Sequence, residues 1–232
     1  MENDSTIALE RKKSAQLAVL RQVYIWMSLA LFITGITALI IVNDSRLLYT
    51  LLSNSMLFWG IAIAELALVF ILSGRISRLS MTTATIMFII YSILNGVTMS
   101  LLFIIYTSES IAATFFITAG TFAAVSAYGY ITKRDLSSWG SILTMGLIGL
   151  IIASVVNIFL TSETLYWVIS YAGVILFVGL TAYDTKRIKE AVMSSDADES
   201  AYKIALMGAL TLYLDFINLF IYLLRIMGNR NN

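Results

Sequence analysis

Apolar residues along this chain gather in seven long runs that are separated by short polar stretches. Each run is close to the roughly 20 residues that an α-helix needs to cross a hydrocarbon core about 30 Å thick. The pattern therefore predicts an all-α integral membrane protein, a bundle of seven transmembrane helices joined by short connections. The runs lie at about 22–42, 56–73, 82–106, 110–131, 139–160, 165–185 and 204–226.

The predicted organisation has three parts. Residues 1–21 form a cytoplasmic N-terminal segment, 22–226 form the seven-helix transmembrane domain, and 227–232 form a short C-terminal tail. The first segment lacks a small-residue cleavage site after a short apolar core, so we expect no removed signal peptide. The longest polar stretch inside the domain, 186–203, is charged and is predicted to be a solvated loop.

Basic residues outside the predicted spans are distributed unevenly between the two faces of the membrane. One face carries 12 of them and the other carries 3. The positive-inside rule then predicts a cytoplasmic N-terminus and, after seven crossings, an extracytoplasmic C-terminus. A six-span arrangement with both ends inside is the second choice. The residues on the more basic face are Arg11, Lys12, Lys13, Arg21, Arg75, Arg78, Lys133, Arg134, Lys186, Arg187, Lys189 and Lys203, and those on the other are Arg46, Arg225 and Arg230.

Composition agrees with this class and excludes several kinds of chemistry. Hydrophobic residues make up 59% of the chain and charged residues 12%, which is more apolar than a domain with a wetted exterior needs to be. The chain contains neither Cys nor His. Disulfides, thiolate catalysis, His-ligated zinc and an imidazole general base are therefore excluded, and with them a serine protease of the usual kind.

Asp215 is the ionisable residue that the pattern places deepest in a span. Counting about 1.5 Å per helical residue, it lies roughly 16 Å from Ile204 and roughly 15 Å from Arg225. That is near mid-depth of the hydrocarbon core. An Asp at this depth costs at least about 2.5–3.5 kcal/mol if it faces lipid, so we expect it to face protein, water or an ion. The alternative is a buried hydrogen bond with a structural role.

Asp184 lies where the sixth predicted span meets the cytoplasm, and it is the second candidate. One interpretation is an interfacial carboxylate paired with Lys186 or Arg187. The other is a partnership with Asp215, since two carboxyls in a poorly hydrated site titrate as one unit and offer oxygen ligands to a divalent cation such as calcium. By rise per residue the two lie roughly 12 Å apart along the membrane normal. Pairing then requires helix seven to be displaced toward the cytoplasm, or a water-filled inner vestibule.

The motifs that carry the two aspartates resemble a known family. Thr181-Ala182-Tyr183-Asp184-Thr185 and Leu212-Tyr213-Leu214-Asp215-Phe216-Ile217-Asn218-Leu219-Phe220 look like the Bax inhibitor-1 (transmembrane Bax inhibitor motif) family. Lys133-Arg134-Asp135-Leu136-Ser137, after the fourth span, resembles the bacterial members. The start of the first span and the closing Gly228-Asn229-Arg230 look most like the bacterial inner-membrane branch.

The resemblance implies a fold in which helix seven is wrapped by the other six. It also implies a pH-sensitive calcium leak, or calcium/proton-coupled transport, governed by Asp184 and Asp215. An arginine at the inner end of helix two is implied to latch Asp184, with Arg75 as the candidate and Arg78 as its rival. Glu65 corresponds to a position that is acidic in some relatives and an amide in others, and is an accessory candidate. We expect no enzymatic activity, and no cofactor other than a bound calcium ion.

Two other functions fit parts of the sequence. A pair of aspartates on helices six and seven also resembles the intramembrane aspartyl proteases, but Leu212 and Leu214 stand where those enzymes have glycines, and the chain has no Pro. The third function is a membrane interaction protein that modulates a membrane protease or a stress response, which would tolerate Asp215→Asn. The expected partners are thus the lipid bilayer, calcium, protons and a membrane protein, with no nucleic acid.

Overall fold

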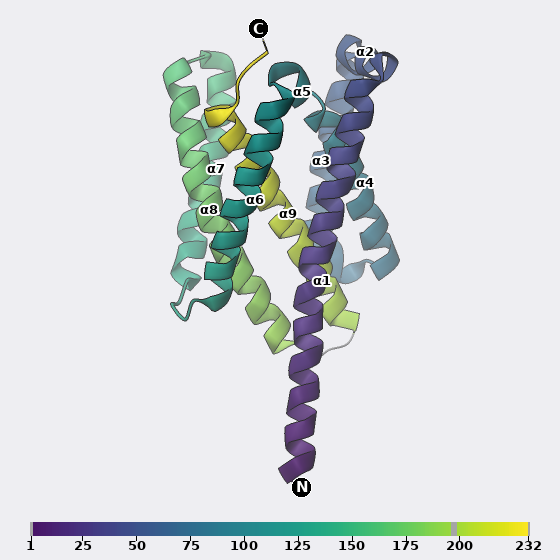
Figure 1. Ribbon diagram of the computed structural model, residues 1–232, viewed down its shortest axis with the longest axis vertical. Helices are drawn as coiled ribbons and strands as arrows, with labels where there is room; N and C mark the ends of the chain where they lie inside the picture. Colours follow the sequence, from purple (N-terminus) through teal and green to yellow (C-terminus); the bar gives the residue numbers. More distant parts are fainter. Residues whose placement is uncertain (1, 196–198, 232) are drawn as a thin grey trace. The chain divides into compact units, whose positions relative to one another are not determined.

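The computed structural model describes residues 2–195 and 199–231, and nearly all of these residues are helical (Figure 1). Seven helices among them are long and apolar enough to cross a membrane, which confirms the predicted all-α membrane protein with seven spans. The elements are α1 (Glu2–Asn43), α2 (Ser45–Ser53), α3 (Ser55–Arg75), a 3-10 helix η1 (Ile76–Arg78), α4 (Met81–Met99), α5 (Leu102–Ile105), α6 (Ser108–Ile131), α7 (Ser137–Leu160), α8 (Glu163–Ser194) and α9 (Glu199–Met227).

Polar side chains cap several helices at the points where the sequence turns from polar to apolar. Asp44 accepts hydrogen bonds from the first backbone N–H groups of α2, and Asn54 does the same for α3. Ser80 and Thr107 cap α4 and α6 in the same way. Because each cap satisfies donors that the helix cannot pair itself, these residues fix where the helices begin. The short α2, inside the first connection, is an element that the apolar pattern does not predict.

The predicted solvated loop at 186–203 is wrong for most of its length. The sixth span continues as α8 to Ser194, and α9 begins at Glu199; residues 196–198 lie outside the described part of the chain. Ile188 and Val192 are buried and stand one helical turn apart, so the helix keeps an apolar stripe beyond the purely apolar run. As a result Asp184 lies ten residues, about 15 Å, before the end of α8 rather than at that end.

The chain divides into two compact units, each described here by itself. Unit 1 comprises residues 1–105 and 190–213, and unit 2 comprises 106–189 and 214–232. The first half of α9 therefore belongs to unit 1 and the second half to unit 2. In α9, 67% of the most apolar window is buried, compared with 6% to 33% in the other six candidate spans. Its central place among the helices stays a prediction.

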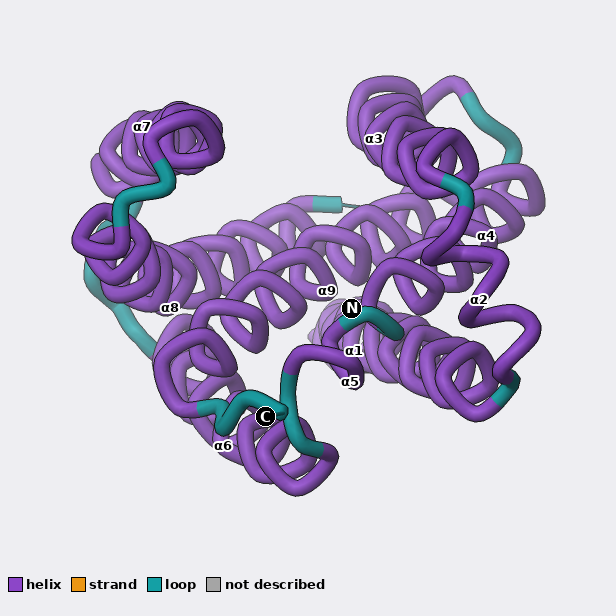
Figure 2. Tube along the Cα trace, turned by 90° about the horizontal axis from the view of Figure 1, so that it is seen from above, coloured by secondary structure: helices purple, strands orange, loops and turns teal. Residues whose placement is uncertain are grey.

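In unit 1, α4 packs against both α1 and α3 (Figure 2). Gly96 lies at the crossing of α4 with α1, where an added Cβ would stand 2.6 Å from the backbone oxygen of Thr34. The hydroxyl of Thr34 donates to the carbonyl of Ser92 at 2.9 Å and is 2.7 Å from the hydroxyl of Tyr213. The first half of α9 is thereby joined to α1 by a buried hydrogen bond.

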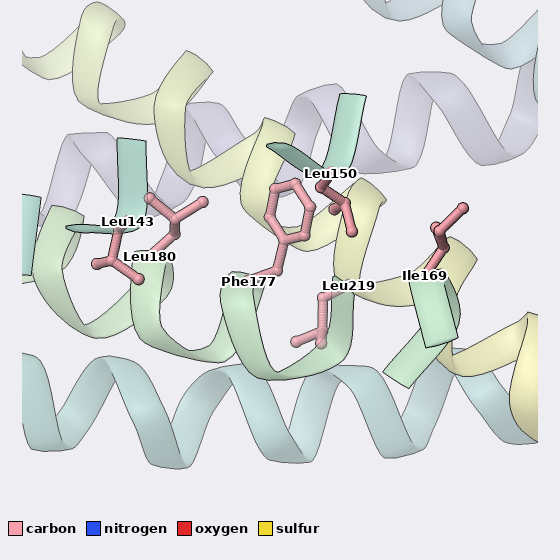
Figure 3. Packing of buried hydrophobic residues seen from close by; sticks show 6 residues of the cluster. All are labelled: Leu143, Leu150, Ile169, Phe177, Leu180 and Leu219. Carbon is pink, nitrogen blue, oxygen red and sulfur yellow. The ribbon is translucent and has the colours of Figure 1, made fainter. Parts of the chain in front are cut away.

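Unit 2 contains α6, α7, α8 up to Lys189 and the second half of α9, and its core is apolar. Gly129 of α6 lies directly against the backbone of Ala182 on α8, and a Cβ there would collide with the Ala182 carbonyl. Because Gly129 has no side chain, α6 can approach α8 closely at Ala182, which lies two residues before Asp184. The core cluster contains Leu143, Leu150, Ile169, Phe177, Leu180 and Leu219 (Figure 3).

Candidate functional site

Asp184 of α8 and Asp215 of α9 meet inside unit 2. Their carboxyl groups lie close enough to interact with each other. The two side chains are only 8% and 4% exposed. In the described part of the chain, no N–H or hydroxyl group donates to Oδ2 of Asp215. The two aspartates are therefore brought together despite the 12 Å offset expected from the sequence.

The two threonine hydroxyl groups nearest to Asp184 along α8 donate to other acceptors. Thr181 donates to the carbonyl of Phe177 at 2.7 Å, and Thr185 donates to the hydroxyl of Ser126 on α6 at 3.3 Å. Arg187, one turn along α8, is the positive charge that acts on Asp184. The interpretation of Asp184 as a carboxylate paired with Lys186 or Arg187 stays a prediction, and it does not exclude the proximity of Asp184 to Asp215.

Aromatic rings pack around Phe216, the residue that follows Asp215 on α9. Phe216, next to Asp215, packs edge-on against Phe115 and Phe122 of α6, with ring centroids 5.5 Å apart in both cases. Phe122 and Phe216 are themselves buried. The residue next to Asp215 on α9 is thus held in an apolar environment.

Lysines beyond Asp184 hold the end of α6 and the turn before α7 to α8. Lys186 donates to the carbonyl of Arg134, and Lys189 donates to the carbonyl of Tyr130 at 2.7 Å. The ammonium of Lys189 also lies 4.4 Å from the centroid of the Tyr130 ring. Cations at the C-terminal end of a helix satisfy its last carbonyl groups. The motif after the fourth span thus has a structural function that its resemblance alone does not specify.

The remaining candidates lie in unit 1. Glu65 of α3 accepts a hydrogen bond from the hydroxyl of Thr98 on α4 at 3.0 Å. Arg75 is the last residue of α3 and Arg78 is the last of η1, and both are exposed. Since the two aspartates belong to unit 2, the latch stays a prediction for Arg75 or Arg78, and so does the accessory role of Glu65.

Sequence reasoning missed the contacts of the C-terminal tail. Tyr106 and Arg230 form an isolated antiparallel β-bridge. The backbone N–H of Thr107 donates to the carbonyl of Asn229 at 3.0 Å, and the N–H of Asn229 donates to the hydroxyl of Ser110 at 2.9 Å. The tail is therefore tied to the start of α6. The partners are more than 100 residues apart in the chain, and no local pattern in the sequence links them.

Comparison with known proteins identifies the family of the chain. The family model described as "Inhibitor of apoptosis-promoting Bax1" matches residues 16–232. The chain is 50% identical to the inner membrane protein YbhL of Escherichia coli over 211 residues, 90% of each chain. It is 46% identical to a protein of Borreliella burgdorferi over 92% of each chain, and 39% identical to a membrane protein of Streptococcus pyogenes over 80% of each. The chain is thus a multi-pass membrane protein that belongs to the Bax inhibitor-1 family.

Proposed function

We propose that the protein is a pH-sensitive calcium leak channel of the bacterial inner membrane, with Asp184 and Asp215 as the shared site for protons and calcium. The observation that supports the proposal is the approach of two buried carboxyl groups, from two different helices, close enough to interact. The location follows from the relative in Escherichia coli, which is named an inner membrane protein.

Two carboxylates at this separation repel each other strongly when both are ionised in a poorly hydrated place. A shared proton removes the repulsion, as in other carboxyl pairs, and a divalent cation removes it equally well. Protons and calcium would then compete for the same oxygen atoms. Because both residues lie inside membrane spans, this competition would make the passage of the cation depend on pH.

Calcium at this pair is better described as cargo than as a resident ion. A stable calcium site supplies six to eight oxygen ligands. No group of three or more acidic, His or Cys side chains that could hold a metal occurs in the part of the chain that the structure describes. Two carboxylates completed by backbone carbonyls and water would bind calcium weakly. Weak binding suits conduction, since an ion must leave a site as readily as it enters.

The test is calcium flux into liposomes that contain the purified protein, measured across a series of pH values. The wild type is expected to admit calcium at a rate that changes with pH. Asp215→Asn keeps the shape of the side chain but removes one anionic ligand, and we expect it to lose most of the pH-dependent flux. If Asp215→Asn conducts as the wild type does, the aspartate pair does not control flux. A role as a regulator of another membrane protein is then favoured.

Asp135→Asn is the matched control, because it makes the same chemical change at a carboxyl outside the spans. Oδ1 of Asp135 accepts a hydrogen bond from the backbone N–H of Ser137 at 2.8 Å, at the start of α7. Hydrogen bonds from Ser137 hold the pKa of this exposed carboxyl below its usual range. This group stays ionised through the neutral range, so Asp135→Asn is expected to leave the pH dependence of flux intact.

A further inference from the structure

A polar cavity of about 440 Å³ lies in unit 2 at the junction of α7, α8 and the end of α9. Its volume falls within the range of small-molecule binding sites. The residues that give it its chemical character are Asn157, Glu163, Tyr166, Trp167, Arg225 and Arg230. We call it the arginine pocket. None of these residues belongs to the aspartate pair, so the pocket is independent of the proposed calcium leak.

Two guanidinium groups gather at one aromatic ring in the arginine pocket. The guanidinium carbon of Arg225 lies 5.7 Å from the centroid of Tyr166, and that of Arg230 lies 5.9 Å from the same centroid. Arg230 also donates from Nη2 to the hydroxyl of Tyr166 at 3.4 Å, and Arg225 lies 5.2 Å from the ring of Tyr222. The rings attract the faces of the guanidinium planes and so restrain their orientation.

An anion would complete this arrangement. In the described part of the chain, the contacts of Arg225 and Arg230 are made with aromatic rings and a hydroxyl, and neither guanidinium forms an ion pair with a carboxylate. A guanidinium that stacks through its face keeps its N–H edge for two parallel hydrogen bonds to phosphate oxygens. Two such groups beside one ring repel each other until an anion is bound between them.

The charge of the lining favours a monoanion. Glu163 lines the pocket together with the two arginines, so the three side chains carry a formal net charge of +1. A phosphodiester carries a single negative charge, whereas inorganic phosphate or a phosphomonoester carries about −1.5 to −2 near neutral pH. The lining and a bound phosphodiester are thus neutral together, and the carboxylate of Glu163 weakens anion binding in general.

The neighbouring aromatic residues indicate the level of the membrane at which the pocket lies. Trp167 stacks on Tyr171, with ring centroids 6.0 Å apart, and packs edge-on against Tyr166. Both Trp167 and Tyr171 are exposed at the beginning of α8, where the sixth span starts. Exposed Trp and Tyr at the end of a span are typical of the headgroup region of a bilayer. A phosphodiester in that region belongs to a phospholipid.

We propose that the arginine pocket binds the phosphodiester of an anionic phospholipid, with Arg225 and Arg230 as the ligands of the phosphate and Tyr166 as the residue that positions them. The site is selective for a lipid of net negative charge, because the guanidinium groups repel the cationic headgroup of a zwitterionic lipid. The negative charge of Glu163 lowers the affinity of the pocket for the phosphate.

The test uses the full chain in nanodiscs of mixed phosphatidylglycerol and phosphatidylcholine, followed by native mass spectrometry of the lipids that the protein retains. The wild type is expected to retain phosphatidylglycerol in preference to phosphatidylcholine. In the double variant Arg225→Gln/Arg230→Gln this preference falls by about tenfold or more, since charge-assisted contacts to the phosphate are lost. Arg46→Gln is the matched control, because it removes an exposed arginine in unit 1, outside the pocket, and the preference should persist.

Glu163→Gln separates a binding role from a structural one, because it should raise the retention of phosphatidylglycerol. If the double variant does not fold, Arg230→Gln alone serves, since Arg230 is exposed. Retention of phosphatidylglycerol that does not differ between the wild type and the arginine variants overturns the proposal. Inorganic phosphate is added in a second arm. If it displaces phosphatidylglycerol from the wild type at equal concentration, the ligand is a soluble phosphate and the assignment to a lipid is wrong.

Discussion

Tyr213 and Asp215 lie two residues apart on α9, and both are almost fully buried. The hydroxyl of Tyr213 is hydrogen-bonded, whereas within the described residues one carboxyl oxygen of Asp215 is not. In unit 1 the hydroxyl of Tyr213 meets Thr34, which in turn donates its only hydroxyl proton to the carbonyl of Ser92. Tyr213 must therefore be the donor to Thr34, and every proton in this chain of hydrogen bonds has an acceptor. In unit 2 Asp215 faces another acid, and its Oδ2 receives no hydrogen bond in the described part of the chain.

The difference shows that burial of a polar residue in a span is not by itself a sign of function. A satisfied hydrogen-bond chain such as that of Tyr213 fixes the position of one helix against another and asks for no further ligand. Two acids that face each other are incomplete without a proton or a cation. We therefore assign a structural role to Tyr213 and propose a functional role for Asp215.

The largest expected effect comes from removing the charges of the acid pair one at a time. Asp184→Asn and Asp215→Asn should each reduce the pH-dependent part of calcium flux by about tenfold, which corresponds to about 1.4 kcal/mol. The double variant should be little worse than either single variant, as expected for residues that act together. Flux into liposomes across a pH series is the measurement. Additive effects of the two substitutions would mean that the carboxyls act separately.

A smaller effect is expected from the helix crossing that supports the pair. Gly129→Ala places a methyl group against the backbone of Ala182, which should cost about 1–3 kcal/mol in free energy of unfolding. Because Ala182 is two residues from Asp184, this variant should also weaken the pH dependence of flux. Thermal unfolding in detergent measures the first effect and liposome flux the second.

Gly120→Ala on the same helix is the control for this substitution. An added Cβ at Gly120 meets no atom within 4 Å, so the variant should be neutral or gain up to about 1 kcal/mol from helix propensity. Equal losses of stability in the two variants would show that Gly129 is not a specific point of contact between α6 and α8.

The smallest effect is expected at the satisfied hydrogen bond of unit 1. Tyr213→Phe keeps the ring, which packs edge-on against Phe88 and Tyr91, and removes one hydroxyl. The loss of free energy of unfolding should be about 1 kcal/mol, and the pH dependence of flux should match that of the wild type. A loss of pH dependence in Tyr213→Phe would contradict the separation of roles between Tyr213 and Asp215.

The seven spans and the two aspartates were predictable because their signals are local. Hydropathy needs only about 20 consecutive residues, and an acid within an apolar run stands out from its neighbours. Whether Asp184 approaches Asp215 could not be decided from local signals. The continuation of α8 was also missed, because it depends on buried Ile188 and Val192 and not on an unbroken apolar run. A hydrogen bond such as that of Thr34 to Tyr213 joins residues 179 positions apart, and no sequence pattern links them.

The division of unit 2 into two separate stretches of the chain has a consequence for biosynthesis. Residues 106–189 leave the ribosome before 214–232, so Asp184 emerges ahead of its partner, which lies thirty-one positions later in the chain. The last span must then be inserted with Asp215 not yet joined to Asp184, at a cost of about 2.5–3.5 kcal/mol that its Leu, Ile and Phe residues offset. Assembly of the acid pair is for this reason an event that follows insertion of the last span.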